Sequence, residues 1–544
     1  MVFLSILIFL KNLLFFGKVW QIKEYRIDRI SDWLQNENGL KIIFNKIVII
    51  YLFLFFFGIF GENIFSFVQN FLPVLKNISF QKIFFYSIFV IFIAEIFLIF
   101  FKLFQNKLVV PKFTSRMSLI FLVSVILNIL ILSFVGFNFE NILFIIFLLN
   151  AQFLIFGLGV FLTYPVAKHL KSTITISAKN KIAELKNLKK VGITGSYGKS
   201  TVKSFLVQVF EQNFSTIGTF ENQNTPLGIS NLILKKLDDT FEYFFCEMGA
   251  YKQLEIRELG EIVNHKYGFL TGINNQHLAL FGSQANVVLG KSEIAEKVFE
   301  NDGVLYVNGD SFFCKKAQFP KGLKIVFYGL NKLNSAFSEI VDFSENGMKF
   351  NFFYKGEKYI FEVDILGKHN ILNLTGVLAF SFDQGLTHEQ IQNALKTLKT
   401  PEKNLELTKK FFDDGRKIFL INDTYNSNFD GVLSACDSVQ IFGNAKKVLV
   451  LDDILELGKG ARDIHIELGR ELAKFDFDEI CLVGRNFRAY VEQGLKEKGF
   501  PEEKIFFNFI FDFLEKNLDA KNEKQIFLFE GRETEKYFEK VKNF

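Results

Sequence analysis

Cysteine is scarce in this chain: its 544 residues include four, and they stand far apart, each in or near an apolar run. This spacing gives neither a disulfide framework nor a zinc-binding motif, and it suits a reducing compartment. An excess of charge is also missing, because the formal net charge is only +5. So small an imbalance gives no argument for nucleic acid as a partner. The four residues are Cys246, Cys314, Cys436 and Cys481.

Internal repeats and low-complexity tracts are missing from the second half of the chain. Phenylalanine is abundant instead, with 72 residues spread through every segment. We interpret this abundance as a codon bias towards A and T rather than as a binding feature, which the base composition of the coding sequence would test. The length predicts about three domains.

Five long apolar runs lie in the first 165 residues. A helix of about 20 apolar residues crosses a bilayer, so these runs predict five transmembrane helices. The first run is the weakest because Lys11 interrupts it. A cleaved signal peptide is the alternative there, but no small-residue cleavage site follows. The runs are residues 2–16, 47–60, 83–101, 118–137 and 142–162.

Lysines and arginines are concentrated in every second loop between these runs. The loops in between hold few or none, which places everything after Tyr164 in the cytoplasm and the N-terminus outside. We therefore expect a multi-pass protein of the cytoplasmic membrane with cytoplasmic catalytic domains. The basic loops hold Lys18, Lys23, Arg26, Arg29, Lys41 and Lys46; Lys102, Lys107, Lys112 and Arg116; and Lys168, Lys171, Lys179 and Lys181.

Two polar features of this region allow two interpretations each. Glu95 lies in the middle of the third run, where a carboxylate is costly; it is either functional or a paired structural residue. Residues 20–40, with Trp33, are charged and aromatic. They form either an interfacial helix or a contact to a lipid or substrate head group.

The second half alternates short apolar runs with amphipathic stretches, a rhythm typical of a parallel sheet with crossover helices. Turn-separated strands follow at residues 336–364, helices at 369–383 and 387–398, and a linker near 400–403. A second strand–helix series comes after the linker. The predicted strands are residues 190–194, 241–248, 267–272, 304–308 and 323–328, then 417–422, 446–452, 479–483, 504–507 and 525–530.

A glycine-rich string, T-G-S-Y-G-K-S-T, follows the first of these strands at residues 194–201. A strand that runs through such a turn into a helix directs backbone N–H groups at one point, where a phosphate can lie. Lys199 would add a charge for the β- and γ-phosphates, and Ser200 a ligand for Mg²⁺. The spacing departs from G-x-x-x-x-G-K-[ST] because Ile193 stands at the first glycine position. A plain strand–turn–helix connection is the alternative.

Three more polar residues stand where phosphoryl transfer needs them. Glu247 ends a strand and is a candidate Mg²⁺ ligand. His277 follows the next strand, although a loop histidine satisfied by backbone groups would look the same. Lys291 would ordinarily be a solvated helix residue.

Taken in order, these strings resemble the Mur ligase family, the ATP-dependent amide ligases of peptidoglycan precursor synthesis, and most closely its MurF branch. The resemblance covers about residues 188–530. Its further elements are N-Q-N-T-P-L-G at 222–228, E-M-G-A at 247–250, K-S-E at 291–293, N-G-D at 308–310, G-K-H-N-I-L-N at 367–373, D-T-Y-N-S-N at 423–428, and L-D-D-I-L-E-L-G at 451–458 with His465.

Together, the apolar runs and the resemblance predict an α-helical membrane region followed by α/β domains. These are the membrane region at residues 1–165, a P-loop-type central ATPase domain with a mostly parallel sheet at 166–402, and a Rossmann-like C-terminal domain at 403–544. ATP would phosphorylate a substrate carboxylate, and an amine would attack the acyl phosphate. The products would be an amide, ADP and phosphate.

The resemblance also assigns residues. The catalytic ones would be Lys199, His277 and Lys291, the last carbamylated by CO₂. Two Mg²⁺ ions would be held by Ser200 and Glu247, and by His277. ATP would contact the loop, with Asn370 at adenine and Asp423 at ribose. The loop residues are Gly195, Ser196, Gly198, Lys199, Ser200 and Thr201, and the substrate residues would be Asn222, Asn224, Thr225, Tyr425, Asn426 and Asn428.

The departures from the family pattern affect the expected binding of the substrate more than the expected binding of ATP. Membrane runs stand where the MurF pattern has a soluble UDP-binding domain. The G-R-L-E string reads K-N-L-E at residues 403–406, with Asn404 replacing arginine, and the K-G-S-R string reads E-G-R-E at 530–533. Tyr197 stands where asparagine is usual.

We therefore expect a membrane-bound ATP-dependent carboxylate–amine ligase. It would join a small-molecule, UDP-linked or lipid-linked envelope precursor to an amino acid or dipeptide amine. A membrane polymer ligase similar to poly-γ-glutamate synthase, a catalytically silent scaffold for wall synthesis, and a transport ATPase are the alternatives. The last lacks a separate set of coupling motifs.

Overall fold

The computed structural model divides into two compact units, Met1–Ser172 and Thr173–Phe544. It describes residues 2–36, 39–72, 79–105, 107–135, 139–220, 223–274, 281–344, 347–413, 415–425, 427–455, 457, 460–507 and 524–543.

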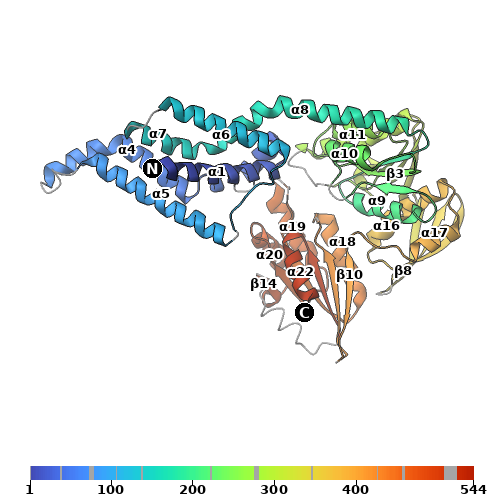
Figure 1. Ribbon diagram of the computed structural model, residues 1–544. Helices are drawn as coiled ribbons and strands as arrows, with labels where there is room; N and C mark the ends of the chain where they lie inside the picture. The colour runs from blue at the N-terminus through green and yellow to red at the C-terminus, as the bar shows by residue number, and fades with distance from the viewer. Residues whose placement is uncertain are drawn as a thin grey trace. The chain divides into compact units, whose positions relative to one another are not determined.

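The first unit consists of helices that pack side by side (Figure 1). Among the described helices, five are long and apolar enough to cross a membrane: α1, α4, α5, α6 and α8. The first four coincide with the first four predicted runs. The helices are α1 (Val2–Ile22), α2 (Ile27–Asn36), α3 (Gly39–Ile43), α4 (Lys46–Phe71), α5 (Phe80–Phe104), α6 (Ser115–Val135), α7 (Phe139–Asn150) and α8 (Gln152–Glu184).

The fifth predicted run is not one continuous helix, and this expectation was wrong. It breaks at Ala151, between α7 and α8. The flanking amides bond back into the preceding turn, from Asn150 Nδ2 to the Ile146 carbonyl at 2.9 Å and from Gln152 Nε2 to the Leu148 carbonyl at 2.8 Å. Such bonds compete with the backbone ladder and accompany kinks. Because apolarity alone does not reveal a break, the sequence pattern missed it.

Glu95 is a paired residue in this bundle. Its carboxylate accepts hydrogen bonds from Lys11 Nζ of α1 and from the Tyr51 hydroxyl of α4, and it is 4% exposed. A second buried polar contact joins Asn128 and Gln152, whose side-chain amides bond reciprocally at 3.2 and 2.9 Å. These contacts support the structural interpretation of Glu95, since both of its oxygens have partners.

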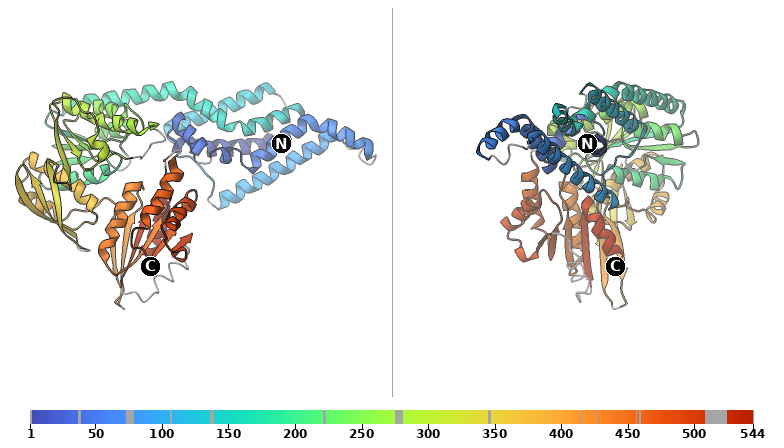
Figure 2. Two further views of the ribbon diagram at one scale, coloured as in Figure 1. Left: turned by 180° about the vertical axis from the view of Figure 1, so that it is seen from behind. Right: turned by 60° about the vertical axis from the view of Figure 1, so that its left-hand side comes forward.

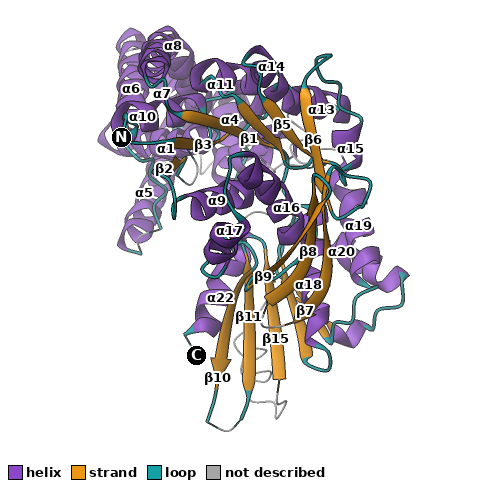
Figure 3. Ribbon diagram, turned by 90° about the vertical axis from the view of Figure 1, so that its right-hand side faces the viewer, coloured by secondary structure: helices purple, strands orange, loops and turns teal. Residues whose placement is uncertain are grey.

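The second unit begins with a nine-stranded sheet in the order β2-β3-β1-β4-β5-β6-β7-β8-β9 (Figure 3). Neighbouring strands are parallel from β2 to β7, and β7, β8 and β9 pair antiparallel. The strands are β1 (Lys189–Thr194), β2 (Thr216–Gly218), β3 (Tyr243–Glu247), β4 (Tyr267–Leu270), β5 (Val304–Asn308), β6 (Lys324–Gly329), β7 (Ala336–Ser344), β8 (Gly347–Tyr354) and β9 (Glu357–Val363).

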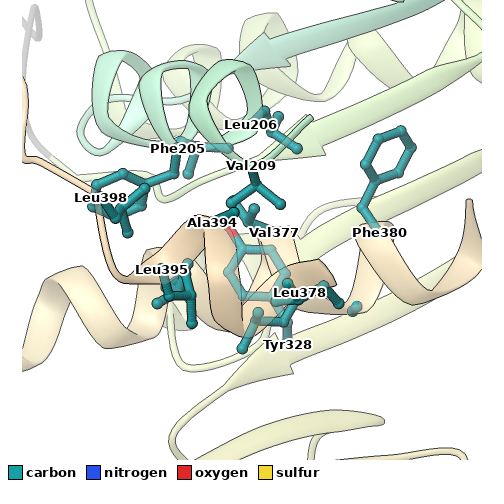
Figure 4. Close-up of a cluster of buried hydrophobic side chains, with 14 of the residues drawn as sticks. Phe205, Leu206, Val209, Tyr328, Val377, Leu378, Phe380, Ala394, Leu395 and Leu398 are labelled. Carbon is teal, nitrogen blue, oxygen red and sulfur yellow. The ribbon is translucent and has the colours of Figure 1, made fainter. Parts of the chain in front are cut away.

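Helices pack against this sheet and bury its core. Three of them, α9, α16 and α17, enclose the apolar cluster in Figure 4 together with Tyr328 of β6. The helices are α9 (Lys199–Phe210), α10 (Pro226–Lys236), α11 (Glu255–Val263), α13 (Gln284–Ser292), α14 (Ile294–Glu300), α15 (Phe312–Lys315), α16 (Lys368–Asp383) and α17 (His388–Leu395).

The second sheet has six strands in the order β10-β11-β15-β12-β13-β14 and appears orange to red in Figure 2. All neighbours are parallel except β10, which pairs antiparallel with β11. The elements are β10 (Glu406–Phe411), β11 (Lys417–Asp423), α18 (Phe429–Val439), β12 (Lys446–Leu451), α19 (Ala461–Leu472), β13 (Glu479–Leu482), α20 (Arg488–Glu497), β14 (Ile505–Phe507), β15 (Lys524–Glu530) and α22 (Glu535–Lys542).

The α/β prediction for the second half is therefore confirmed, and every predicted strand is present. Two strands were missed, β2 and β10. The first has three residues, and β10 is an edge strand of sequence E-L-T-K-K-F without a continuous apolar run. Edge strands are commonly short or charged, which weakens their sequence signal.

Candidate active site

The glycine-rich loop lies between β1 and α9, as the sequence predicts. Gly195 has φ +155° and Gly198 has φ +77°, conformations that side chains disfavour. The Ser196 N–H donates to the Gly272 carbonyl at 2.6 Å, which ties the loop to the end of β4. Helix α9 begins at Lys199, so its free N–H groups face the loop. This is the geometry of an anion site.

Lys199 folds back over the loop. Its Nζ donates to the carbonyls of Gly195 at 2.8 Å and Ser196 at 3.1 Å. Burial lowers the pKa of its ammonium, and the charge of Glu247 opposes that shift. The Ser196 hydroxyl is buried and has no hydrogen-bond partner among the residues that the structure describes. A donor without a partner beside a loop of N–H groups fits a phosphate oxygen.

Glu247 ends β3 next to this loop and is 6% exposed. Lys203 Nζ lies 3.1 Å from its Oε2, and Asn224 Nδ2 lies 3.3 Å from its Oε1. Burial opposes ionisation, but the charges of Lys203 and Lys199 outweigh it and lower the carboxyl pKa. The Ser200 side chain also hydrogen-bonds this carboxylate. Glu247 is thus held as an anion.

These two oxygen donors, Ser200 and Glu247, fit a Mg²⁺ ion, which prefers hard oxygen ligands. In the described part of the chain, no group of three or more His, Cys, Asp and Glu side chains could hold a metal alone. A Mg²⁺ ion here would need phosphate oxygens and water to complete its shell, as it does in nucleotide sites.

Lys291 is buried rather than solvated, at 1% exposure. Its Nζ donates to the Ala250 carbonyl at 3.0 Å and lies 5.7 Å from the centre of the Phe281 ring. Burial, and then the charge of Lys199, lower its pKa well below the usual range. The buried position thus favours the neutral amine, the form that reacts with CO₂.

The predicted substrate residues fall into three groups. Asn224 hydrogen-bonds Glu247, and the next residue, Thr225, caps the first turn of α10. Asn428 caps α18 and accepts from Asn274 Nδ2 at 3.0 Å, while Tyr425 donates its N–H to the Lys403 carbonyl at 3.1 Å. The remaining predictions, Asn222, Asn426 and the proposed metal ligand His277, lie outside the described residues.

The two residues predicted at adenine and ribose are both engaged in other contacts. Asn370 is 2% exposed, and its Nδ2 donates to the Leu366 carbonyl at 2.6 Å. Asp423 faces Glu530 on the neighbouring strand, and burial raises its pKa to about 7. The Ser427 hydroxyl donates to Glu530 Oε1 at 3.0 Å. A nucleotide contact at either residue therefore remains a prediction.

Tyr197, Thr271, Asn274 and His369 shape the site although sequence reasoning gave them no role. The Tyr197 ring covers Gly272, its hydroxyl bonds to Ser311, and its carbonyl accepts from Thr271 Oγ1. Asn274 Nδ2 donates to Asp430 Oδ2 at 2.9 Å. His369 Nδ1 lies 2.5 Å from Ser434 Oγ. The last two contacts join α18, which follows a strand of the second sheet, to residues that follow strands of the first sheet.

A glycine loop that opens a helix, a carboxylate at the adjacent strand end and a buried lysine define an ATP-using α/β enzyme. The family model for the Mur ligase middle domain matches residues 193–381. The chain belongs to the Mur ligase family, and the predicted enzyme class, an ATP-dependent ligase, is confirmed with it.

Within that family the chain is similar to MurF proteins. It is 28% identical over 338 residues to UDP-N-acetylmuramoyl-tripeptide–D-alanyl-D-alanine ligase of Borreliella burgdorferi, covering 61% of this chain and 68% of that one. It is 30% identical over 316 residues to the Bacillus subtilis ligase of the same name, covering 58% and 66%. The crystal structure of MurF from Acinetobacter baumannii superposes with a TM-score of 0.61 at 25% identity, covering 69% and 81%. The chain thus spans about two thirds of the length of these curated relatives.

Proposed function

We propose that this protein is a membrane-bound, ATP-dependent carboxylate–amine ligase that acts on a peptidoglycan or other cell-envelope precursor. One observation carries the proposal: the loop at residues 195–201 and the carboxylate of Glu247 meet at the ends of neighbouring parallel strands. That juxtaposition places a phosphate cradle, a lysine and an oxygen ligand at one point. Phosphoryl transfer needs such charge neutralisation and in-line placement more than covalent help from the protein.

The reaction proceeds in three steps. The γ-phosphoryl group of ATP passes to an oxygen of the substrate carboxylate, which forms an acyl phosphate and ADP. The nitrogen of the amine attacks the acyl carbon and gives a tetrahedral intermediate. This intermediate expels phosphate, and the amide remains after the nitrogen loses a proton.

Each site residue has a part in this scheme. The loop N–H groups bind the phosphates, and Lys199 releases its two loop carbonyls to neutralise the β- and γ-phosphates. Ser200 and Glu247 would hold Mg²⁺, which supplies further neutralisation of the triphosphate when bound. Contacts such as Asn274 with Asp430 would bring the second sheet over the site, where water must be excluded from the acyl phosphate.

Lys291 is proposed to act as a carbamate. Its neutral amine would add to CO₂ and lose one proton, which turns a cationic side chain into an anion. Burial and the nearby charge of Lys199 favour the neutral amine, and the charge of Lys199 also favours the later anion. With His277, the carbamate would help to hold a second Mg²⁺.

The substrates follow from the relatives by analogy only. Their names specify a UDP-N-acetylmuramoyl-tripeptide and D-alanyl-D-alanine. We propose a precursor of that chemistry, UDP-linked or lipid-linked, and an amino acid or dipeptide amine. The substitutions at Asn404 and at residues 530–533 leave the identity of the amine more open than the use of ATP.

Membrane attachment is part of the proposal. Its support is the set of five helices long and apolar enough to span, together with the one-sided distribution of basic loops. The chain would be a multi-pass protein of the cytoplasmic membrane with both sheets on the cytoplasmic side.

Product analysis tests the proposal. Membranes that contain the full chain would be incubated with ATP, UDP-N-acetylmuramoyl-tripeptide and D-alanyl-D-alanine, and the products followed by mass spectrometry. One amide bond per precursor supports the proposed ligase. A ladder of longer products would identify the polymer ligase instead, and unchanged precursors with every amine would favour a silent scaffold.

A further inference from the structure

Lys203 gives Glu247 a cationic partner where the proposed metal would bind. Its ammonium lies 3.1 Å from Glu247 Oε2, and the two side chains are only 11% and 8% exposed. The other carboxylate oxygen accepts from Asn224 Nδ2 at 3.3 Å. Both oxygens of the predicted metal ligand are therefore in use by donors from this chain.

Helix geometry puts Lys203 at this position. It follows Lys199 by one turn of α9, so both ammonium groups lie on the same face of the helix. Two like charges at this spacing repel each other, and an anion near both of them offsets that repulsion. Both lysines act on the carboxylate of Glu247, which lies at the end of β3.

A Mg²⁺ ion binds a carboxylate oxygen at about 2.0–2.1 Å and demands a nearly regular shell. The Lys203 ammonium at Oε2 takes part of the space and the charge that such an ion needs. We propose that Lys203 is a built-in competitor for the metal at Glu247, which keeps the carboxylate paired until a metal–nucleotide complex displaces the ammonium. This inference rests on the proposed role of Glu247 as a metal ligand.

The competition predicts a direction of change. Removing the charge of Lys203 deletes both the competing partner and one source of repulsion for a cation, so metal affinity must rise. We expect Lys203→Met to bind Mn²⁺ about tenfold or more tightly than the wild type. Lys203→Gln keeps a hydrogen-bond donor without charge and should show the same gain. Lys203→Arg keeps the charge and should show none.

The experiment measures Mn²⁺ binding by electron paramagnetic resonance of the free ion, with the full chain in nanodiscs and a non-hydrolysable ATP analogue present. Lys297→Met is the matched control, because Lys297 is a similarly buried lysine that pairs with Glu261 and Glu300 away from the loop. Glu247→Gln should remove the site in every background. If Lys203→Met fails to fold, Lys203→Gln alone decides the result.

The outcomes separate this inference from the proposed function. Tighter binding in both neutral variants and not in Lys297→Met supports competition. Equal or weaker binding in the neutral variants, with normal binding in the wild type, overturns the competition and leaves the ligase proposal intact. If the wild type binds no Mn²⁺ with nucleotide, or if Glu247→Gln binds as the wild type does, both proposals fail.

Discussion

The ring of Tyr197 lies directly over the backbone of Gly272. A methyl group at residue 272 would lie 2.2 Å from Tyr197 Cζ and 2.6 Å from its hydroxyl oxygen. Tyr197 belongs to the phosphate loop, and Gly272 follows β4, so this contact joins two neighbouring strand ends. The loop position depends on a glycine that its own motif does not contain.

Gly272→Ala should therefore push Tyr197 and the loop aside. We expect a loss of about 1–3 kcal/mol in stability, as overpacking usually costs, and weaker nucleotide binding. Tyr197→Asn removes the ring, so the alanine should be tolerated in the double variant. Thermal unfolding of the two single variants and the double variant measures this coupling. Gly460→Ala is the control, since the nearest atom to the new methyl group, among the described residues other than its own helix backbone and chain neighbours, is Ile464 Cδ1 at 3.6 Å. Additive effects would show that the ring and residue 272 do not compete for space.

Lys291→Ala should abolish ligase activity, with a loss of about 100-fold or more, and short-chain carboxylates should restore part of it. The reason is that a small carboxylate can enter the buried pocket and supply the negative charge of the missing carbamate. An unmodified amine cannot supply that charge. Steady-state turnover with and without added formate or acetate checks this. Lys297→Ala serves as the control lysine. A fully active Lys291→Ala enzyme would disprove the carbamate.

The carboxyl pair of Asp423 and Glu530 makes stability depend on pH. The pKa of Asp423 in the folded protein is about 7, above its ordinary value, so its stabilising contribution is fully present below about pH 4 and is lost as the pH rises through 7. Between pH 5 and pH 8 the wild type should lose about 2–4 kcal/mol from this pair.

Glu530→Gln should remove part of that loss, because burial and the charge of Asp423 also raise the pKa of Glu530, and the amide cannot ionise in the unfolded chain. Unfolding midpoints at pH 5 and pH 8 measure the difference. Glu533→Gln is a suitable control, since Glu533 is an exposed neighbour paired with Lys536. If Glu530→Gln loses as much stability with rising pH as the wild type does, the pair is not the cause.

The ion pair of Lys11 and Glu95 predicts an asymmetric pair of variants. Glu95→Leu takes this partner from the partly buried ammonium of Lys11 and should destabilise the first unit by about 3–5 kcal/mol, whereas Lys11→Leu with Glu95→Leu removes both charges and should cost much less. The amount of folded protein recovered in detergent and its melting temperature report the effect. Tyr51→Phe, which keeps the pair, should have a small effect. An equal loss of stability in the Glu95→Leu variant and in the double variant would contradict this account, because the cost would not come from the unpaired charge.

Sequence pattern predicted the regular parts of this protein well. The strand at residues 304–308 has its predicted limits, because a short apolar run between turn signals leaves few alternatives. The glycine loop was found from the spacing of Gly195, Gly198 and Lys199. These features depend on neighbours in sequence, which a pattern can record.

Features that depend on distant neighbours were missed. Nothing near Tyr197 in sequence reveals that Gly272 supports it, and nothing near His369 reveals Ser434. The break at Ala151 needs the amide bonds of its flanking residues, which apolarity does not report. Lys203 could have been found, since it stands one turn after Lys199, but its partner Glu247 comes from another strand.

The most direct test of the ligase proposal is phosphate release by the full chain in membranes, measured with each substrate omitted in turn. We predict release only when ATP, an envelope-precursor carboxylate and an amine are all present, and none from Lys199→Ala. Phosphate release that continues without the amine, or its absence with every envelope precursor and amine offered, would contradict the proposal.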